Sequence, residues 1–468
     1  MSIEARPSRR FFRRNPAAIE PPPNLLNYAD QALFLALRTL DQESIIQATW
    51  IYEHPVDYEG LSRFHGNFGY GLAGRLIERS PLPFGRHRWV SALGAPMDIE
   101  LGEARPRSEL SDWVDERAQL PMDPEWGPGW RIGVLPMTDG STAISMTGSH
   151  ALGDGIAAAM RAFEAVAGNR SDLGYPLPNS RTKSQAVKED LRQAARDLPD
   201  AARALRAAVK MVVAKRRESG RRQPAVSPAI SPSDLKQSIM LPAVFVTLDI
   251  AEWDAVAERL GGNGHSLLAG FAAKVAQRIG RVNPQDGSVT LLIPISERQS
   301  FDDGRANAVV IATAKVDPAG IYDDLASART AMRDSVQKAR DEPDETIEFL
   351  PLIPWMPKRA VRGVVNTAFG FNSDTPVFCS NVGDLPPEIL RIDGTEAEAL
   401  FFRGIDRHVT REALEKRSGL LTIMAGRVGC RVLMSVVAYQ PGWENTKYKL
   451  RELVSETLAD FGLNGRIE

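Results

Sequence analysis

Residues 146–160 read MTGSHALGDGIAAAM and join an apolar, β-prone run to a run of helical character. His150 stands at the junction, and Asp154 and Gly155 follow it. A histidine has an ordinary pKa near 6.5, so a neutral imidazole here could accept a proton. Asp154 would either orient that imidazole or fix the loop by pairing elsewhere, and Gly155 would let backbone or ligand approach closely. The alternative is a satisfied core histidine beside a helix-capping aspartate.

The sequence around this stretch predicts a scaffold for the loop. Residues 129–149 contain two β-prone runs around Thr138-Asp139-Gly140, which is the pattern of a β-hairpin. A helix is expected after Gly155, ending near Gly168. Further upstream, Asn27 or Asp30 could cap a first helix. Residues 57–77 predict a helix loosened by its glycines. A loop held between a strand and a helix is a common place for a functional side chain.

The rest of the chain divides into further segments. We expect a flexible basic tail over 1–23, an N-terminal lobe over 24–168, a helical crossover with a Pro/Ser linker over 169–240, and a C-terminal lobe over 241–468. The last segment alternates strands and helices and ends in a long hairpin over 419–439 and a closing amphipathic helix. Both lobes mix the two element types, so the expected fold class is α/β (α+β).

Composition excludes several functional classes. The 468 residues carry 57 basic and 59 acidic side chains, a net charge of −2, which does not indicate a nucleic-acid partner. Cys379 and Cys430 lack the density of a disulfide framework, so a cytoplasmic setting is expected. No apolar run is long enough to predict a spanning helix. The six histidines show no metal-helix spacing, and we expect no metal and no bound cofactor.

Three other motifs fail at particular positions. No GxxxxGK[ST] phosphate loop is present. The stretch GGNGHSLLAG places Leu267 where a dinucleotide fingerprint requires its third glycine. The same stretch places Leu268 where a serine-hydrolase elbow requires a glycine.

The crossover has a basic end. Residues 203–222 contain eight Lys or Arg and one acid. Leu205, Val209, Val212 and Val213 would form an apolar stripe if this segment is helical. One interpretation is a crossover packed on the surface of the fold. The other is a peripheral contact with a membrane surface or an acidic partner.

The ordered series of these motifs resembles the chloramphenicol-acetyltransferase-like acyltransferases, which include condensation domains and wax ester synthase/diacylglycerol acyltransferases. The shared motif is HxxxDG, here His150, Asp154 and Gly155. The resemblance covers roughly residues 24–465. It is carried further by LNYADQALFLAL (26–37), NGHSLLAGFAAKVAQRIG (263–280), IPISERQ (293–299), NAVVIATAKVD (307–317) and CSNVGDLP (379–386).

The resemblance implies two lobes in a pseudo-twofold arrangement with a tunnel between them. His150 is implied as the general base that deprotonates a hydroxyl or amine acceptor as it attacks an acyl thioester. The donor would be an acyl-CoA or an acyl carrier protein with a phosphopantetheinyl thioester, used as co-substrate. Asp154 is implied to form a buried bidentate ion pair with an arginine of the second lobe, for which Arg298 is the candidate.

The chain also departs from the family pattern. Ser149 occupies the position of a first histidine in many members, and Gly264 and His265 stand where wax ester synthases have Asn-Asp. Ser149, His265 and Asn381 are therefore candidates for contacts with the acceptor or the tunnel. Ester formation on a lipid or secondary metabolite is the expected reaction. Amide formation, or a noncatalytic binding module that retains the fold, are the alternatives.

Overall fold

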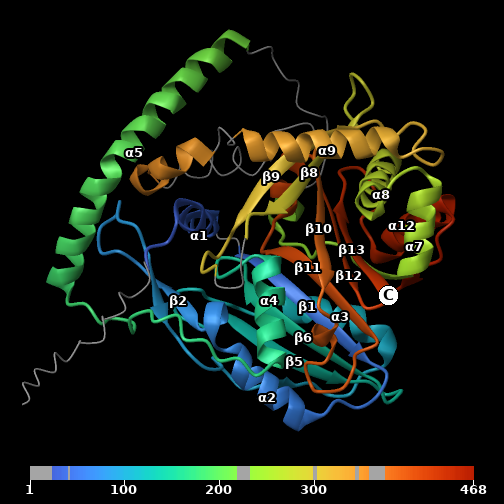
Figure 1. The fold of residues 1–468 in the computed structure, drawn as a ribbon, viewed down its shortest axis with the longest axis horizontal. Coiled ribbons are helices and arrows are strands. Elements are labelled where there is room, and N and C mark those ends of the chain that lie inside the picture. Colours follow the sequence, from blue (N-terminus) through green and yellow to red (C-terminus); the bar gives the residue numbers. More distant parts are fainter. Residues whose placement is uncertain (1–23, 41–42, 219–231, 299–302, 343–346, 358–374) are drawn as a thin grey trace, which may run out of the picture.

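The computed structural model describes residues 24–40, 43–218, 232–298, 303–342, 347–357 and 375–468. Two β-sheets with helices packed on them dominate this part of the chain (Figure 1). The expected tail over 1–23 and most of the Pro/Ser linker lie outside the described residues.

The first sheet carries the hairpin that leads into the His150 stretch. Its strands are β1 (Glu43–Tyr52), β4 (Glu100–Leu101), β5 (Trp130–Pro136), β6 (Thr142–Ser149) and β11 (Ala399–Arg407), in the order β11-β1-β6-β5-β4. Strands β5 and β6 pair antiparallel across the turn predicted at Thr138-Asp139-Gly140, so the hairpin is confirmed. Gly140 has a φ of +90°, a conformation that a glycine adopts without strain.

Helices α2 (Tyr58–Phe68), α3 (Leu110–Ala118) and α4 (Gly155–Val166) accompany this sheet, and Figure 1 shows α4 lying across its strands. A two-stranded sheet of β2 (Arg75–Glu78) and β3 (Arg88–Ser91) lies beside it, and the short helices η1 (Gly71–Ala73), η2 (Arg107–Glu109) and η4 (Pro387–Leu390) complete the region. The helix predicted over 57–77 was wrong beyond Phe68. A side chain at Gly69 would collide with the backbone of Gly94, and Gly71 has a φ of +57°, so the chain leaves the helix there.

The second sheet contains most of the C-terminal half. Its strands are β7 (Ala243–Asp249), β8 (Val289–Ser296), β9 (Val309–Val316), β10 (Val377–Leu385), β12 (Leu420–Val428), β13 (Arg431–Tyr439) and β14 (Arg466–Ile467), in the order β14-β7-β13-β12-β10-β8-β9. The predicted hairpin over 419–439 is confirmed as β12 and β13.

Helices α7 (Ile250–Arg259), α8 (Gly264–Arg278), α9 (Ala326–Asp341) and α12 (Lys447–Phe461) cover this sheet. The short helices α6 (Pro232–Lys236) and α11 (Arg411–Lys416) contact each other, and α11 packs Leu414 against residues of β7 and β13. Asn263 caps α8 by accepting from the backbone N–H groups of His265 and Ser266, while Ser266 returns the bond to Asn263. This capping box explains why the GGNGHSLLAG stretch starts a helix rather than a phosphate loop or a nucleophile elbow.

Strand β11 corrects the predicted boundary between the lobes. It lies within the range 241–468, yet it pairs along its whole length with β1 of the first sheet, from Glu43–Arg407 to Ile51–Ala399. Its alternating side chains Leu400 and Phe402 then contribute to the apolar interior of the first lobe. The C-terminal segment therefore completes the N-terminal lobe, and the two lobes do not divide at one point of the chain.

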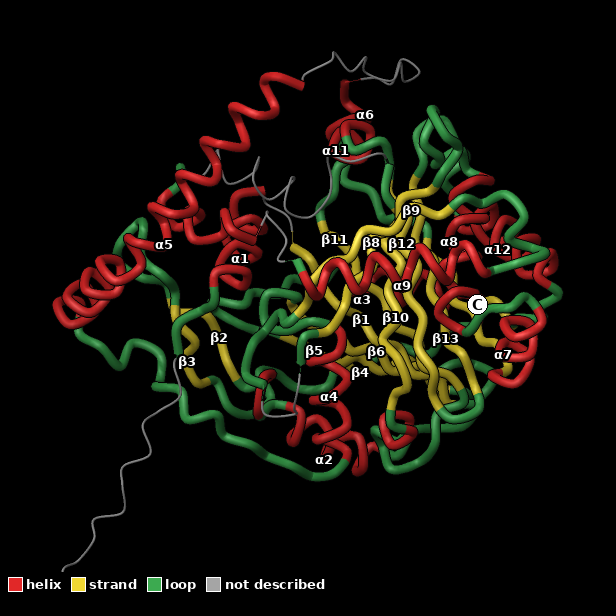
Figure 2. The backbone as a smooth tube through the Cα atoms, turned by 45° about the horizontal axis from the view of Figure 1, so that its top comes forward, coloured by secondary structure: helices red, strands yellow, loops and turns green. Residues whose placement is uncertain are grey.

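The crossover contains the long helix α5 (Lys183–Glu218), and helix α1 (Tyr28–Leu40) and the 3-10 segment η3 (Ile347–Trp355) lie on its inner side. Figures 1 and 2 both show α5 at the periphery, on the opposite flank from α7, α8 and α12. Asn27 caps α1 by accepting from the Asp30 N–H at 2.6 Å, which settles the two expected alternatives in favour of Asn27. Among the described helices, none is both long enough and apolar enough to cross a membrane.

Candidate active site

The His150 loop connects β6 to α4. At the start of the loop the backbone still bonds to β1, because the His150 N–H donates to the Ser44 carbonyl at 2.9 Å. The Leu152 N–H then bonds back to the Ser149 carbonyl, so the loop turns tightly. Asp154 is the N-cap of α4, and its Oδ1 accepts from the Ala157 N–H at 2.8 Å. The loop is therefore fixed at both ends by ordinary strand and helix contacts.

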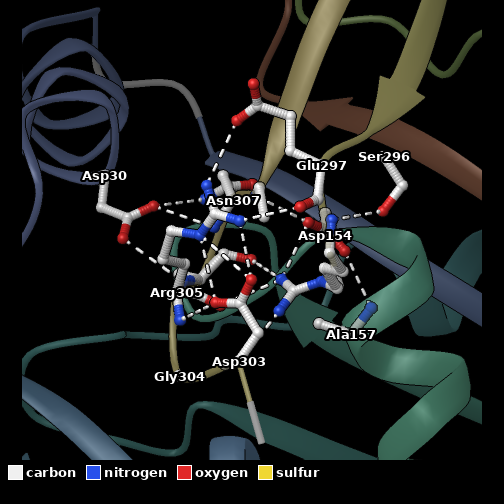
Figure 3. A network of polar contacts seen from close by, with 12 residues as sticks. Asp30, Asp154, Ala157, Ser296, Glu297, Asp303, Gly304, Arg305 and Asn307 are labelled. Carbon is white, nitrogen blue, oxygen red and sulfur yellow. Dashed lines mark hydrogen bonds and ion pairs between the residues drawn. The ribbon is translucent and has the colours of Figure 1, made fainter. Parts of the chain in front are cut away.

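The Asp154 carboxylate faces the second lobe and not the His150 ring. Its Oδ2 accepts from Arg298 Nη2 at 2.9 Å and from the Ala308 N–H at 3.0 Å (Figure 3). Both side chains are nearly excluded from solvent, with 3% of Arg298 and 6% of Asp154 exposed. Of the two roles considered for Asp154, the geometry supports locking the loop.

The pair is not bidentate, which corrects the expected geometry. Only Nη2 of Arg298 reaches Asp154, and the same nitrogen also donates to the carbonyls of Arg305 and Ala306. Nη1 donates to the Asp303 carbonyl at 3.0 Å. The guanidinium thus organises the turn over 303–306 as well as binding Asp154. Oδ1 of Asp154 accepts from the Ala157 N–H, so the contact with Arg298 is made through Oδ2 alone.

Segment 303–308 of the second lobe supports the loop along its length. The Asp154 N–H donates to the Ala306 carbonyl at 2.9 Å. Asn307 Nδ2 approaches the His150 carbonyl at 3.4 Å. Figure 3 shows this segment facing Asp154 and the first turn of α4. The two lobes therefore contact each other at the loop that carries the HxxxDG motif.

Two further buried charges hold the same segment, and sequence reasoning missed their role. Arg75 on β2 donates to the Gly304 carbonyl at 2.7 Å and to the Leu152 carbonyl at 3.0 Å. Asp30 on α1 accepts from the Asn307 N–H at 2.9 Å. Burial lowers the pKa of Arg75 and raises the pKa of Asp30, because each charge has lost most of its hydration. Asp30 stood in a stretch that resembles the family, whereas nothing in the sequence singled out Arg75.

The His150 side chain is half-buried. Its Nδ1 atom is buried and has no hydrogen-bond partner among the described residues. A buried ring nitrogen without a partner is uncommon in a folded protein and is more often found at a functional site than elsewhere. No carboxylate of the described residues orients this ring, in contrast to a catalytic triad.

An apolar cavity of about 110 Å³ lies between the lobes beside this loop. Strands β1, β6 and β11 and helix α4 line it from the first lobe, and β10 and β12 line it from the second. Ser149, Gly153 and Gly155 are lining residues, whereas His150 is not. A Cβ atom added at Gly155 would meet nothing within 4 Å, so the missing side chain leaves the space open on the cavity side.

His265 and Asn381 lie together but away from this cavity. The Asn381 amide nitrogen is 3.0 Å from His265 Nδ1, at the N-terminus of α8. His265 is exposed, and neither side chain lines the cavity, although Val382 next to Asn381 does. The structure thus brings Ser149 to the cavity wall and pairs the other two candidates with each other. Within the described residues, no group of three or more His, Cys, Asp and Glu side chains is placed to hold a metal ion.

Comparisons with known proteins give structural matches alone. No protein-family model matches the chain, and no curated protein matches it in sequence. Many solved structures match, and three of those that cover nearly all of the chain are described here. The wax ester synthase/diacylglycerol acyltransferase from Marinobacter aquaeolei VT8 is 15% identical, with 94% of this chain and 100% of that chain covered and a TM-score of 0.52. The first condensation domain of the CDA synthetase is 12% identical, with 94% of this chain and 96% of that chain covered and a TM-score of 0.55. The starter condensation domain of rhizomide synthetase, in complex with C8-CoA and Leu-SNAC, is 13% identical, with 94% of each chain covered and a TM-score of 0.50.

These matches establish the fold. The chain shares the two-lobed α/β fold of the wax ester synthase/diacylglycerol acyltransferase and condensation-domain structures, as the resemblance implied.

Proposed function

We propose that this protein is an acyltransferase that moves an acyl group from a thioester to a hydroxyl acceptor, with His150 as the general base. The observation that carries the proposal is the position of His150. It follows β6 at the junction of the two lobes, next to an apolar cavity, in a loop held by the buried Asp154–Arg298 pair. Its half-buried imidazole has a ring nitrogen without a protein partner among the described residues.

The proposed reaction needs one base and no bound cofactor. His150 takes the hydroxyl proton while the acceptor oxygen attacks the thioester carbonyl and forms the new C–O bond. The C–S bond then breaks, and the protonated His150 gives its proton to the departing thiolate, which restores the neutral base. A positioned base contributes about 10²–10⁴-fold to the rate of such a transfer. Holding donor and acceptor in one geometry would contribute further.

The remaining residues of the motif act by positioning. Asp154 and Arg298 fix the loop to segment 303–308, so His150 keeps its place relative to both lobes. Gly155 leaves room for a substrate atom at the start of α4. The α4 N-terminus also presents the partial positive charge of its helix dipole toward this region. Ser149 lines the cavity where it could contact a substrate, whereas His265 and Asn381 would contact only the part of a substrate that extends beyond the cavity.

The cavity indicates an apolar group on one substrate. An apolar protein cavity of about 150 Å³ holds a benzene molecule. The cavity described above, about 110 Å³, would therefore receive a short aliphatic or small cyclic group without rearrangement. The donor would be an acyl-CoA or an acyl carrier protein, and a solved structure of the same fold with C8-CoA supports the former.

Amide formation is the second candidate, because two of the similar structures are condensation domains. The same base would serve an amine acceptor. Incubation of the protein with a panel of acyl-CoAs and of alcohols and amines, followed by thiol detection and mass spectrometry of the product, tests both. We expect acceptor-dependent thiol release and an ester product. An amide product would favour the second candidate, and no release above the hydrolysis of a protein-free blank would favour a noncatalytic module.

A further inference from the structure

Helix α5 turns two of its acidic side chains inward, while two others, Glu189 and Asp200, stay at the surface in ion pairs with Arg181 and Arg203. Asp190 and Asp197 point inward and are buried. Asp190 accepts from Arg88 and Arg181, each at 2.9 Å, and Asp197 lies 3.6 Å from Arg86. These contacts anchor the helix to the first lobe. They also remove two of its acids from the outer surface.

The outer side of α5 carries a row of aliphatic side chains. Val187, Leu191, Leu198 and Leu205 are 41%, 55%, 51% and 55% exposed. With 3.6 residues per turn, the four fall within a sector of about 40° and extend over about 27 Å. Six other large apolar side chains are exposed among the described residues, and all lie on other elements. Exposed apolar residues aligned along one helix are a different feature from single exposed leucines.

Cations flank this row. Lys188 and Arg206 are exposed and lie within about a quarter turn of it, on the side away from the body of the protein. Further along the chain, residues 203–222 contain eight basic residues and one acid. The side chains of this basic segment are described up to Ala207, and they include Leu205 in the aliphatic row.

We propose that the α5 face, defined as Val187, Leu191, Leu198 and Leu205 with the flanking Lys188 and Arg206, docks on an anionic lipid surface. An amphipathic helix with aliphatic side chains on one face and Lys or Arg beside them lies in the plane of the membrane interface. Anionic headgroups attract the cations while the aliphatic side chains enter the boundary layer. Figures 1 and 2 show α5 along the outer edge, where a flat surface could reach it.

The charges disfavour a second copy of the chain as the occupant. The spacing of seven residues from Leu191 to Leu198 and Leu205 is compatible with a coiled-coil seam. Two such helices packed on this row would, however, bring Lys188 and Arg206 of both copies near one seam, and like charges beside a helix seam are destabilising. An anionic surface satisfies both the apolar and the basic part of the face.

Vesicle flotation of the full chain tests the proposal without any measurement of activity. We expect the protein to float with phosphatidylcholine vesicles that contain phosphatidylserine, to stay behind with pure phosphatidylcholine, and to bind less as salt rises. The combined change Leu191→Asn, Leu198→Asn and Leu205→Asn should lower binding by at least about tenfold, because three aliphatic side chains no longer enter the interface. Lys188→Ser with Arg206→Ser should lower it on the anionic vesicles.

The matched control changes three exposed leucines elsewhere: Leu93→Asn, Leu101→Asn and Leu177→Asn. This control should bind like the unchanged protein, and all three variants should keep its melting temperature. Absence of flotation, or equal loss in the control, would overturn the proposal. So would self-association in light scattering that the α5 leucine changes abolish, because the face would then bind a second copy.

Discussion

At the scale of single residues, the Asp154–Arg298 pair explains how the loop keeps its shape. The carboxylate is shared between a helix cap, a backbone N–H and a guanidinium, and that guanidinium is shared between Asp154 and three carbonyls. The Asp154 carboxylate and the Arg298 guanidinium each form hydrogen bonds with groups from both lobes. A buried charge with several polar partners tolerates burial, whereas one that has lost its counter-ion does not.

Replacing Arg298 by Ala should lower the free energy of unfolding by about 3 kcal/mol and reduce activity as well, because the Asp154 charge stays buried without its counter-ion. Urea unfolding measures the first effect. The control is Lys338→Ala on α9, whose pair with Glu342 is 73% and 70% exposed and should contribute about 0.5 kcal/mol or less. Equal stability of the two variants would show that the buried pair does not hold the loop.

His87 gives a pH prediction at the same scale. Burial lowers its pKa to about 4. Its ring packs against Phe34, and its Nδ1 accepts from the Ser80 N–H at 3.3 Å. In the unfolded chain the pKa returns to about 6.5. Between pH 6.5 and 4 the unfolded state therefore binds more protons, and stability falls as the pH falls through this window.

His87→Gln should weaken this dependence, since glutamine keeps an acceptor for Ser80 but does not titrate. The effect of His87 amounts to at most about 3 kcal/mol between pH 7 and pH 4. Unfolding free energies of both proteins at pH 7 and pH 5 measure it, with His54→Gln as the control at a more exposed site. If His87→Gln loses as much stability as the parent protein between these pH values, then another group controls the acid sensitivity.

At the scale of elements, the start of α4 serves both folding and the proposed chemistry. Asp154 caps the helix, and Gly155 opens toward the cavity. Gly155 is not among the residues with positive φ, so its backbone does not require glycine. The empty space near its Cα is the feature that a side chain would change.

Gly155→Val should therefore leave the melting temperature close to that of the unchanged protein while it lowers activity. The valine meets no protein atom within 4 Å of its Cβ, but it occupies space beside the loop. Differential scanning calorimetry and acyl transfer with short and long acyl-CoAs are the measurements. The control Gly69→Val should unfold the region, since its Cβ would lie 2.2 Å from the Gly94 backbone. If Gly155→Val kept full activity with every acyl-CoA, the substrate would not pass through the space next to Gly155.

At the scale of the whole molecule, β11 makes the two lobes one folding unit. It pairs with β1 through nine residues, and it follows β10 of the other sheet in the chain. Its Leu400 and Phe402 also line the cavity. The first lobe is therefore incomplete without residues from the C-terminal half of the sequence.

A fragment of residues 24–168 should therefore fail to fold, although it was predicted as a lobe. Without β11, one edge of β1 has no partner and the apolar interior around Trp50 is exposed. Circular dichroism and proton NMR of the fragment test this, with the full chain expected to unfold in one transition. A fragment with dispersed amide signals and a cooperative melt would show that β11 is dispensable.

Strand β11 also separates the parts of the fold that the sequence predicts from those that it does not. The hairpin of β5 and β6, the helix after Gly155 and the hairpin of β12 and β13 follow from local alternation and turn residues, and each was predicted. Strand β11 was not predicted, and its place in the first sheet depends on pairing with β1, more than 340 residues away in the chain, which no local pattern specifies. Arg298 was found through a motif resemblance. Arg75 was not, because a buried arginine that binds two carbonyls leaves no local pattern in the sequence.

The central claim is that His150 is the base, and one comparison tests it most directly. Its backbone N–H, and not its ring, bonds to Ser44, so His150→Ala should keep the fold and the melting temperature. We expect acceptor-dependent thiol release from an acyl-CoA to fall by about 10²–10⁴-fold in this variant, while His54→Ala remains active. Release by His150→Ala at the rate of the unchanged protein, under the same conditions, would contradict the account.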